Sequence, residues 1–415
     1  MPSPAIAPIF KKAYWTLLLG TLFYILALIS FTNPWLQRHI LYCHKFHTAW
    51  WQDISKPEQW GFAKNQITPF NFTTPDNEVL YAWHVMPLGL YAKHEAAILN
   101  QPSGEEITRT KAFQLLRDDP DSRLIVNCML FSLLFLSLVH LFICLYILVH
   151  GNAGTVAQGW RTDSYRSLSD GSTSKIHILG LDYRGFGHST GTPTESGLII
   201  DGIAAVDWAL NIAKVPSDRI VILGHSLGTA VSTAVAEHYA LKSIEFAGVV
   251  LISGFTSIPE LLPDYAIAGL LPVLSPLKRS PALLKIFNNF VVDTWPTATR
   301  LANFVRVSKK LRLFILHAKD DYDIPWFHSD GLFAAAANAT TDGGMEISLL
   351  KSMKKRNTIE MGDGASIGTW KDGEDKIIRE EIVAYGEHNR VLTYATVSLA
   401  ALKAFGLDEG GVLPV

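Results

Sequence analysis

The chain has 415 residues, of which 48% are hydrophobic, and its formal net charge is −2. This length can bury one large core, and the high apolar content indicates apolar surface outside that core. No block of Lys and Arg supplies the clustered positive charge that nucleic acid phosphates require, so we expect no nucleic acid partner. The three cysteines, Cys43, Cys128 and Cys144, have neither metal-site spacing nor a CxxC motif, so we expect no metal ion.

An uncharged apolar run, residues 14–31, follows Lys11 and Lys12 near the N-terminus. It is just long enough for a helix to cross the hydrocarbon core of a bilayer. We therefore predict a membrane anchor in residues 1–34 and a juxtamembrane linker in residues 35–77. A cleaved signal peptide and a buried helix are the alternatives, although no small-x-small cleavage site follows the run. The paired lysines favour a cytoplasmic N-terminus.

Residues 78–407 are predicted to form the main domain, and residues 408–415 a C-terminal tail. Strand-like apolar runs alternate with helical stretches along this part of the chain, with strands expected at residues 80–86, 123–128, 176–181, 220–223 and 246–252. Such alternation predicts an α/β fold with a doubly wound, mostly parallel sheet.

A second apolar stretch, residues 129–149, is long enough to span a membrane. A span here would place the strand at residues 80–86 and the strand at residues 220–223 on opposite sides of the bilayer, and one hydrogen-bonded sheet cannot be divided in this way. Two strand-like segments, residues 124–128 and 143–149, also compete for one position in the sheet. Our hypothesis is that residues 129–149 derive from an unspliced intron or a gene-model error, with a helical insertion and a true span as the alternatives.

The sequence His150-Gly151-Asn152-Ala153-Gly154 follows the apolar residues 147–149. A strand that opens into such a loop is typical of an oxyanion hole, in which a backbone N–H stabilises the charge that forms on a carbonyl oxygen. We expect the N–H of Asn152 to be one such donor. A glycine-rich turn without chemistry is the alternative interpretation.

The sequence Gly224-His225-Ser226-Leu227-Gly228 lies between the apolar run 220–223 and a stretch of small residues, 229–234. This order predicts a strand, a sharp turn and a helix, with the glycines where side chains would obstruct the turn. Ser226 is therefore the candidate nucleophile. The N–H of Leu227 is the candidate second donor of the oxyanion hole.

Two later segments are predicted to lie outside the sheet. Residues 254–307 break into Pro-rich apolar pieces, which favours a lid over the site, either as an acyl-chain pocket in contact with a bilayer or as a packed cap without a substrate role. Residues 340–374 carry several Gly and charged residues and are predicted to be a surface insertion.

A serine nucleophile needs a histidine base and an acid that orients it, and on such a sheet the acid precedes the histidine in the chain. Asp320, Asp321 and Asp323 crowd one turn after the strand-like run 311–317, and one of them, with Asp321 as the first candidate, is expected to be the acid. Two of the fourteen histidines follow it. His328 is too close to Asp321 to come from a later strand, so we expect His388 to be the base.

Five ordered motifs resemble the membrane-anchored α/β-hydrolase-domain lipases that act on monoacylglycerol and lysophosphatidylserine. They are residues 150–154, 182–187, 188–197, 224–228 and 316–321, and the resemblance covers about residues 79–407. It implies an α/β-hydrolase fold, places the acid on Asp321, and implies a membrane anchor with a catalytic domain on the lumenal side of the endoplasmic reticulum. Asp182, which precedes the serine, is expected to brace its own loop.

Together these residues predict hydrolysis of a lipid carboxylic ester through an acyl-enzyme, with Ser226 as nucleophile, His388 as base and Asp321 as acid. No metal or organic cofactor is expected. The expected partners are a lipid acyl ester and the membrane, and the sequence does not determine the oligomeric state. The alternatives are an acyl-protein thioesterase and, if residues 129–149 are genuine, an impaired, membrane-anchored interaction protein.

Overall fold

The computed structural model describes residues 8–44, 51–102, 104–130, 154–172, 174–265 and 274–407. The apolar stretch beyond Leu130, the residues His150, Gly151 and Asn152, and the expected tail at 408–415 lie outside these ranges. The helices of the described part are α1 (Pro8–Ser30), α2 (Pro34–Tyr42), α3 (Leu88–Leu99), α4 (Lys111–Asp118), α6 (Arg161–Asp170), α7 (Glu195–Asp207), α8 (Leu227–Ala240), α9 (Ile258–Leu261), α10 (Pro281–Asn288), α11 (Thr297–Val307), α12 (Phe327–Asn338), α13 (Ile347–Arg356) and α14 (Ala395–Ala404).

The strands form one sheet in the order β1-β2-β4-β3-β5-β6-β7-β10-β9-β8. Their bounds are β1 (Ile67–Thr73), β2 (Val79–Val85), β3 (Arg123–Leu130), β4 (Ile176–Leu181), β5 (Ile220–Ser226), β6 (Gly248–Ile252), β7 (Leu311–Ala318), β8 (Thr358–Gly362), β9 (Ala365–Asp372) and β10 (Lys376–Val383). Strands β4, β3, β5, β6, β7 and β10 run parallel, and the outer pairings are antiparallel. The predicted doubly wound, mostly parallel sheet is confirmed.

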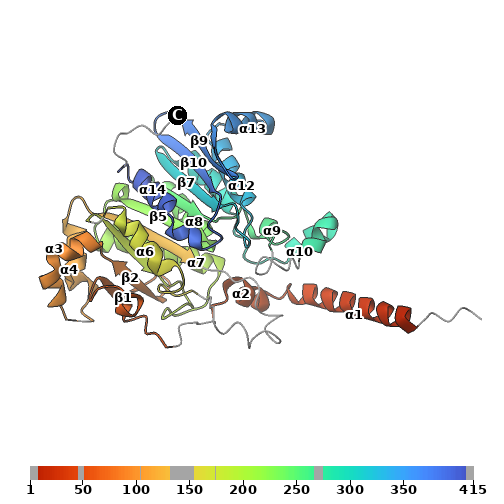
Figure 1. Ribbon diagram of the computed structural model, residues 1–415, viewed down its shortest axis with the longest axis horizontal. Coiled ribbons are helices and arrows are strands. Elements are labelled where there is room, and N and C mark those ends of the chain that lie inside the picture. The colour runs from red at the N-terminus through yellow and green to blue at the C-terminus, as the bar shows by residue number, and fades with distance from the viewer. Residues whose placement is uncertain are drawn as a thin grey trace, which may run out of the picture.

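Helices cover both faces of this sheet (Figure 1). On one face α8 packs against β3 and β5, flanked by α7, α11 and α12, whereas α6 and α14 pack on the other face. Strands β4, β5 and β6 are buried along their whole length, as expected where helices cover both faces of a parallel sheet. The central strands therefore form a rigid support whose carboxyl ends can carry a site.

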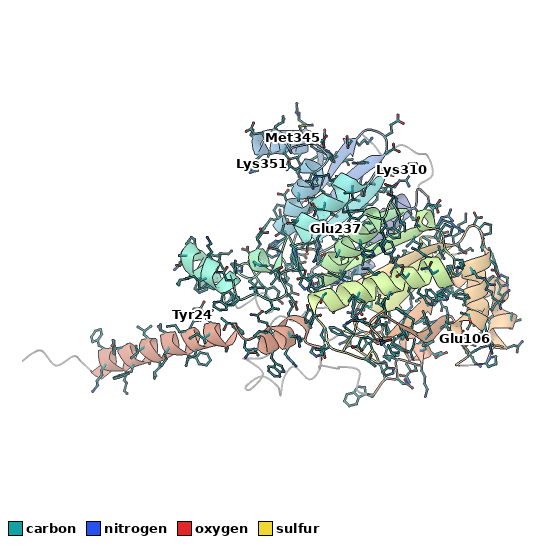
Figure 2. All side chains as sticks on the ribbon, turned by 180° about the vertical axis from the view of Figure 1, so that it is seen from behind. Tyr24, Glu106, Glu237, Lys310, Met345 and Lys351 are labelled. Carbon is teal, nitrogen blue, oxygen red and sulfur yellow. The ribbon has the colours of Figure 1, made fainter. Side chains whose placement is uncertain are left out.

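The apolar helix α1 projects away from the domain (Figure 1). Its segment Phe10–Ser30 is long and apolar enough to cross a membrane, and none of it is buried within the structure. Figure 2 shows that most of α1 extends beyond the domain, whereas Tyr24, nearer to the domain, is partly covered. The alternative of a buried helix is therefore wrong, and the exposed apolar surface fits a membrane anchor.

Several segments differ from the boundaries expected from sequence. Met129 and Leu130, which we assigned to the second apolar stretch, are the last residues of β3 and pair with His225 and Ser226 of β5. The expected linker already contains β1, which pairs with β2. An apolar run does not by itself reveal where a strand ends, because that depends on the neighbouring strand.

The expected lid and surface insertion also contain regular structure. Within residues 254–307, α11 packs on α8 and α12 and so belongs to the helices that cover one face of the sheet. Within residues 340–374, β8 and β9 extend the sheet beyond β10, and α13 packs on β9 and α12. Pairing with distant strands, which local composition does not encode, organises this last segment.

Candidate active site

The candidate nucleophile Ser226 lies at the sharp turn between β5 and α8. Its backbone has φ 56° and ψ −126°, a conformation that non-glycine residues rarely adopt. A Cβ atom on Gly224 would lie 2.4 Å from the carbonyl oxygen of Gly228 and 2.6 Å from Ser232 Oγ. Only glycine therefore fits at position 224, and the predicted strand, turn and helix are confirmed.

The candidate base His388 lies in the loop after β10, with its ring against the nucleophile. Its Nε2 is 2.9 Å from Ser226 Oγ, and its Nδ1 is 2.8 Å from Asp321 Oδ2. Because an ionised carboxylate only accepts hydrogen bonds, Nδ1 carries the proton and Nε2 accepts from the serine hydroxyl. This tautomer leaves Nε2 ready to take the proton of Ser226.

The turn after β7 distinguishes the three candidate acids. Asp321 Oδ2 accepts hydrogen bonds from His388 and His317, and its Oδ1 accepts from the N–H groups of Asp323 and Ile324. Asp320 instead accepts a hydrogen bond from the N–H of Glu387. The structure therefore brings Asp321, and not Asp320, to the histidine.

The pKa values of this pair follow from burial and from mutual attraction. Burial favours the neutral carboxyl, but the charge of His388 and the hydrogen bonds from His317 and His388 hold the pKa of Asp321 well below its usual range. Burial also favours neutral His388, but the charge of Asp321, the hydrogen bond to it and the charge of Asp323 raise the pKa of His388 above 6.5. Asp321 is thus ionised and suited to stabilise an imidazolium.

Two further histidines position the cluster, and we did not single them out from sequence. His225 Nε2 donates to the carbonyl oxygen of His388 over 2.8 Å, and burial lowers the pKa of His225 to about 3, so this ring stays neutral. His317 Nε2 donates to Asp321 Oδ2 and to the carbonyl oxygen of Ile324, while its Nδ1 lies 2.6 Å from Ser329 Oγ. The available signal was a histidine directly after the apolar run 313–316, where His317 stands in β7.

The oxyanion side of the site is described only in part. Leu227 begins α8 and is buried, so its N–H lies at the positive end of the helix, beside Ser226. The described chain resumes at Gly154, where a Cβ atom would lie 2.9 Å from Arg161 Nη2. Asp182 Oδ1 accepts a hydrogen bond from Val156 N–H over 2.6 Å, so this buried carboxyl braces the segment that follows the expected oxyanion loop.

His328, the other histidine that follows Asp321, lies apart from this cluster. Its Nδ1 is 3.1 Å from Thr256 Oγ1, and burial lowers its pKa to about 4. Among the described residues, no group of three or more His, Cys, Asp or Glu side chains is arranged to hold a metal ion. The groups that meet at the site are the hydroxyl of Ser226, the imidazole of His388 and the carboxylate of Asp321.

Ser226, Leu227 and His388 line a small pocket with mostly apolar walls. Its other lining residues are Leu41, Phe255, Ile258, Leu261, Tyr265, Asp323 and Ile324. An apolar pocket with a few convergent polar groups is the usual form of a small-molecule site. The wall that contains Leu41 comes from α2, outside the domain that we expected from sequence.

Comparison with known proteins shows the wider relationship. A family model described as "Alpha/beta hydrolase family" matches residues 146–346. The human protein ABHD12B is 32% identical over 193 residues, which cover 46% of this chain and 50% of that protein. The lysophosphatidylserine lipase ABHD12 of Xenopus tropicalis is 26% identical over 308 residues, which cover 74% of this chain and 67% of that protein.

The chain thus spans between half and about two thirds of the length of these curated relatives. Among solved structures, the esterase Pf2001 of Pyrococcus furiosus is 13% identical with a TM-score of 0.46, over 84% of this chain and 93% of that one. The family match and the curated relatives agree with the resemblance that the sequence motifs indicated. Over residues 146–346 the chain is similar to the α/β-hydrolase family, and its mostly parallel sheet has the α/β-hydrolase fold.

Proposed function

We propose that this protein is a membrane-anchored serine hydrolase that cleaves the carboxylic ester of a lipid, either a lysophospholipid or a monoacylglycerol. The observation that carries the proposal is the hydrogen-bonded chain from Ser226 through His388 to Asp321 at the carboxyl ends of β5, β10 and β7. The lysophosphatidylserine lipases among its relatives support a lipid substrate. The exposed apolar helix α1 supports a substrate that resides in a membrane.

In the first half of the proposed reaction, His388 Nε2 accepts the proton of Ser226 while Oγ attacks the carbonyl carbon of the ester. The carbonyl oxygen becomes an oxyanion, and the N–H groups of Leu227 and Asn152 stabilise it. The C–O bond to the alcohol then breaks, and the imidazolium donates its proton to the leaving oxygen. The products of this half are a free alcohol and an ester between the acyl group and Ser226.

In the second half, His388 accepts a proton from water, and the resulting hydroxide attacks the acyl-enzyme carbonyl. The second tetrahedral intermediate collapses, the proton returns to Ser226 Oγ, and a fatty acid leaves. Asp321 stays ionised throughout and stabilises the imidazolium in both halves. These steps need no metal or organic cofactor.

We also propose that the catalytic domain lies in the lumen of the endoplasmic reticulum. N-glycosylation tests this orientation, and the chain has two acceptor sequences. In Asn71-Phe72-Thr73, Asn71 is exposed in β1 and can be glycosylated. In the sequence at residues 338–340, Asn338 is half-buried, and its Oδ1 accepts a hydrogen bond from Met345 N–H. A lumenal domain predicts an endoglycosidase-sensitive mass shift that Asn71→Gln abolishes. A full chain that inserts in membranes without any such shift contradicts this orientation.

Lipid turnover by the purified full chain tests the function itself. In detergent micelles, the wild type should release fatty acid from lysophosphatidylserine or monoacylglycerol, and Ser226→Ala should lower kcat by a factor of about 10⁶. Ser232→Ala, a matched change at a buried serine in the next turns of α8, should retain activity. Equal turnover by Ser226→Ala would contradict the proposal, and a strong preference for palmitoylated cysteine peptides would reassign the enzyme as an acyl-protein thioesterase.

A further inference from the structure

A second, mainly apolar pocket lies next to the one that contains Ser226. Its walls come from the end of α1 and from α2, from α9, and from the segment around α10, with Ile40, Leu262, Leu274, Phe287 and Val291 among its lining residues. Leu41 and Ile258 line both pockets. These two side chains therefore form the partition between the nucleophile and the second pocket.

The wall formed by α2 is held firmly against the segment that follows α10. Gln37 Nε2 donates to the carbonyl oxygen of Phe290 over 2.7 Å, and its Oε1 accepts from the N–H of Val292 over 3.0 Å. The hydroxyl of Tyr42, which is fully buried, donates to Asp293 Oδ2 over 2.8 Å. Helix α2 is thus fixed to the segment after α10 by two hydrogen bonds between Gln37 and the backbone and by one between the side chains of Tyr42 and Asp293.

The segment around α10, which lines the second pocket, lies on the side of the domain from which the anchor candidate leaves. In both views α10 lies on the side from which α1 projects (Figures 1 and 2). Leu283, Ile286 and Phe290 are each at least half exposed, while Leu284 and Phe287 pack toward the core. A short helix with apolar residues on both its inner and outer sides suits the surface of a bilayer better than open water.

We propose that α2 is part of the substrate site: the acyl chain of the lipid ester passes from Ser226 between Leu41 and Ile258 into the pocket between α2, α9 and α10. This inference rests on the proposed function, since it deepens the description of the same site. An aliphatic chain is the ligand because the lining is mainly apolar and the pocket adjoins the position of the ester carbonyl. The residues after the membrane helix then select substrate as well as connecting the helix to the domain.

Chain-length dependence of the full-length protein in detergent micelles tests this role. The measured quantity is the ratio of kcat/KM for p-nitrophenyl hexadecanoate to kcat/KM for p-nitrophenyl butanoate. Leu41→Phe narrows the passage and should lower this ratio by a factor of about 10, in the range that small changes in an apolar pocket produce. Val291→Phe is a second test that does not depend on the folding of Leu41→Phe. Val291 lines the second pocket but not the one that contains Ser226, and its replacement by Phe should also lower the ratio.

Trp35→Ala is the matched control on α2, because Trp35 is 64% exposed and does not line either pocket. Its ratio should equal that of the wild type. An unchanged ratio in folded Leu41→Phe and Val291→Phe, or an equal loss with both esters, would overturn the role of α2 while leaving ester hydrolysis intact. A wild type that hydrolyses neither ester would instead overturn the proposed function, and this inference with it.

Discussion

The turn after β7 and the segment around α10 line neighbouring pockets, and the side chains of the two regions differ in chemical character. In the turn, the carboxylate of Asp321 is buried and accepts four hydrogen bonds from His317, His388, Asp323 and Ile324. Around α10, Leu283, Ile286 and Phe290 expose apolar surface. Under the proposed function, the polar side would fix the reacting atoms to within a fraction of an ångström, and the apolar side would accommodate a flexible acyl chain.

The polar side should be far more sensitive to one conservative substitution than the apolar side. Asp321→Asn preserves the shape of the side chain but removes its charge and favours the wrong tautomer of His388, so kcat should fall by a factor of about 10⁴. Asp320→Asn is the matched control in the same turn and should change kcat little, because an amide oxygen can still accept from Glu387 N–H. Steady-state turnover of a soluble ester measures both variants, and equal losses would contradict the assignment of the acid.

One of the two proposed oxyanion donors, Asn152, lies outside the described residues. If the N–H of Asn152 stabilises the oxyanion, Asn152→Pro removes that donor and should lower kcat by a factor of about 10² to 10³. Asn152→Ala keeps the backbone N–H and should stay close to the wild type. Equal activity of the proline and alanine variants would remove Asn152 from the mechanism.

The carboxylates around His388 should determine the pH at which kcat/KM falls to half of its maximum. His388 must be neutral to accept a proton, and its pKa is raised above 6.5, so kcat/KM should fall about tenfold per pH unit on the acid side of a midpoint above 6.5. Asp323 contributes to raising the pKa of His388, so Asp323→Asn should move the midpoint to lower pH. A wild-type midpoint below 6.5 would contradict the electrostatics of the cluster.

The apolar side should show the smallest effect, and only with lipid in a membrane. Replacing Leu283, Ile286 and Phe290 together by Ser removes exposed apolar area from α10 and from the segment that follows it, which should lower turnover of lysolipid in vesicles severalfold. Hydrolysis of p-nitrophenyl butanoate in solution should not change, because these side chains line neither pocket. A matching loss with the soluble ester would mean that the substitutions damage the fold instead.

The sequence revealed the polar side better than the apolar side, for a physical reason. The turn at Ser226 requires glycine at position 224, and chain order selects one histidine and one acidic turn, so short local patterns point to the cluster. The choice among Asp320, Asp321 and Asp323 needed the family resemblance, because burial depends on the tertiary structure. His225 and His317 escaped notice because their roles depend on contacts with loops that are distant in sequence.

The second pocket, between α2, α9 and α10, and the strands β8 and β9 depend still more on contacts between residues distant in sequence. Leu41 reaches the site because Gln37 and Tyr42 fix α2 to residues far along the chain, and no local pattern in α2 encodes that partner. The hypothesis that residues 129–149 derive from an unspliced intron or a gene-model error stays a prediction for the residues beyond β3, which ends at Leu130. Sequencing the mature transcript decides it, since codons for residues 131–149 in the dominant message would exclude the error.

The central claim is that Ser226 is activated by His388 to attack an acyl carbon. Reaction of the full chain with a fluorophosphonate, followed by mapping of the modified peptide by mass spectrometry, tests it most directly. The prediction is a single stoichiometric adduct on Ser226 that is lost in Ser226→Ala and retained in Ser232→Ala. No adduct on the folded wild type, or equal labelling of the Ser226→Ala variant, would contradict the claim.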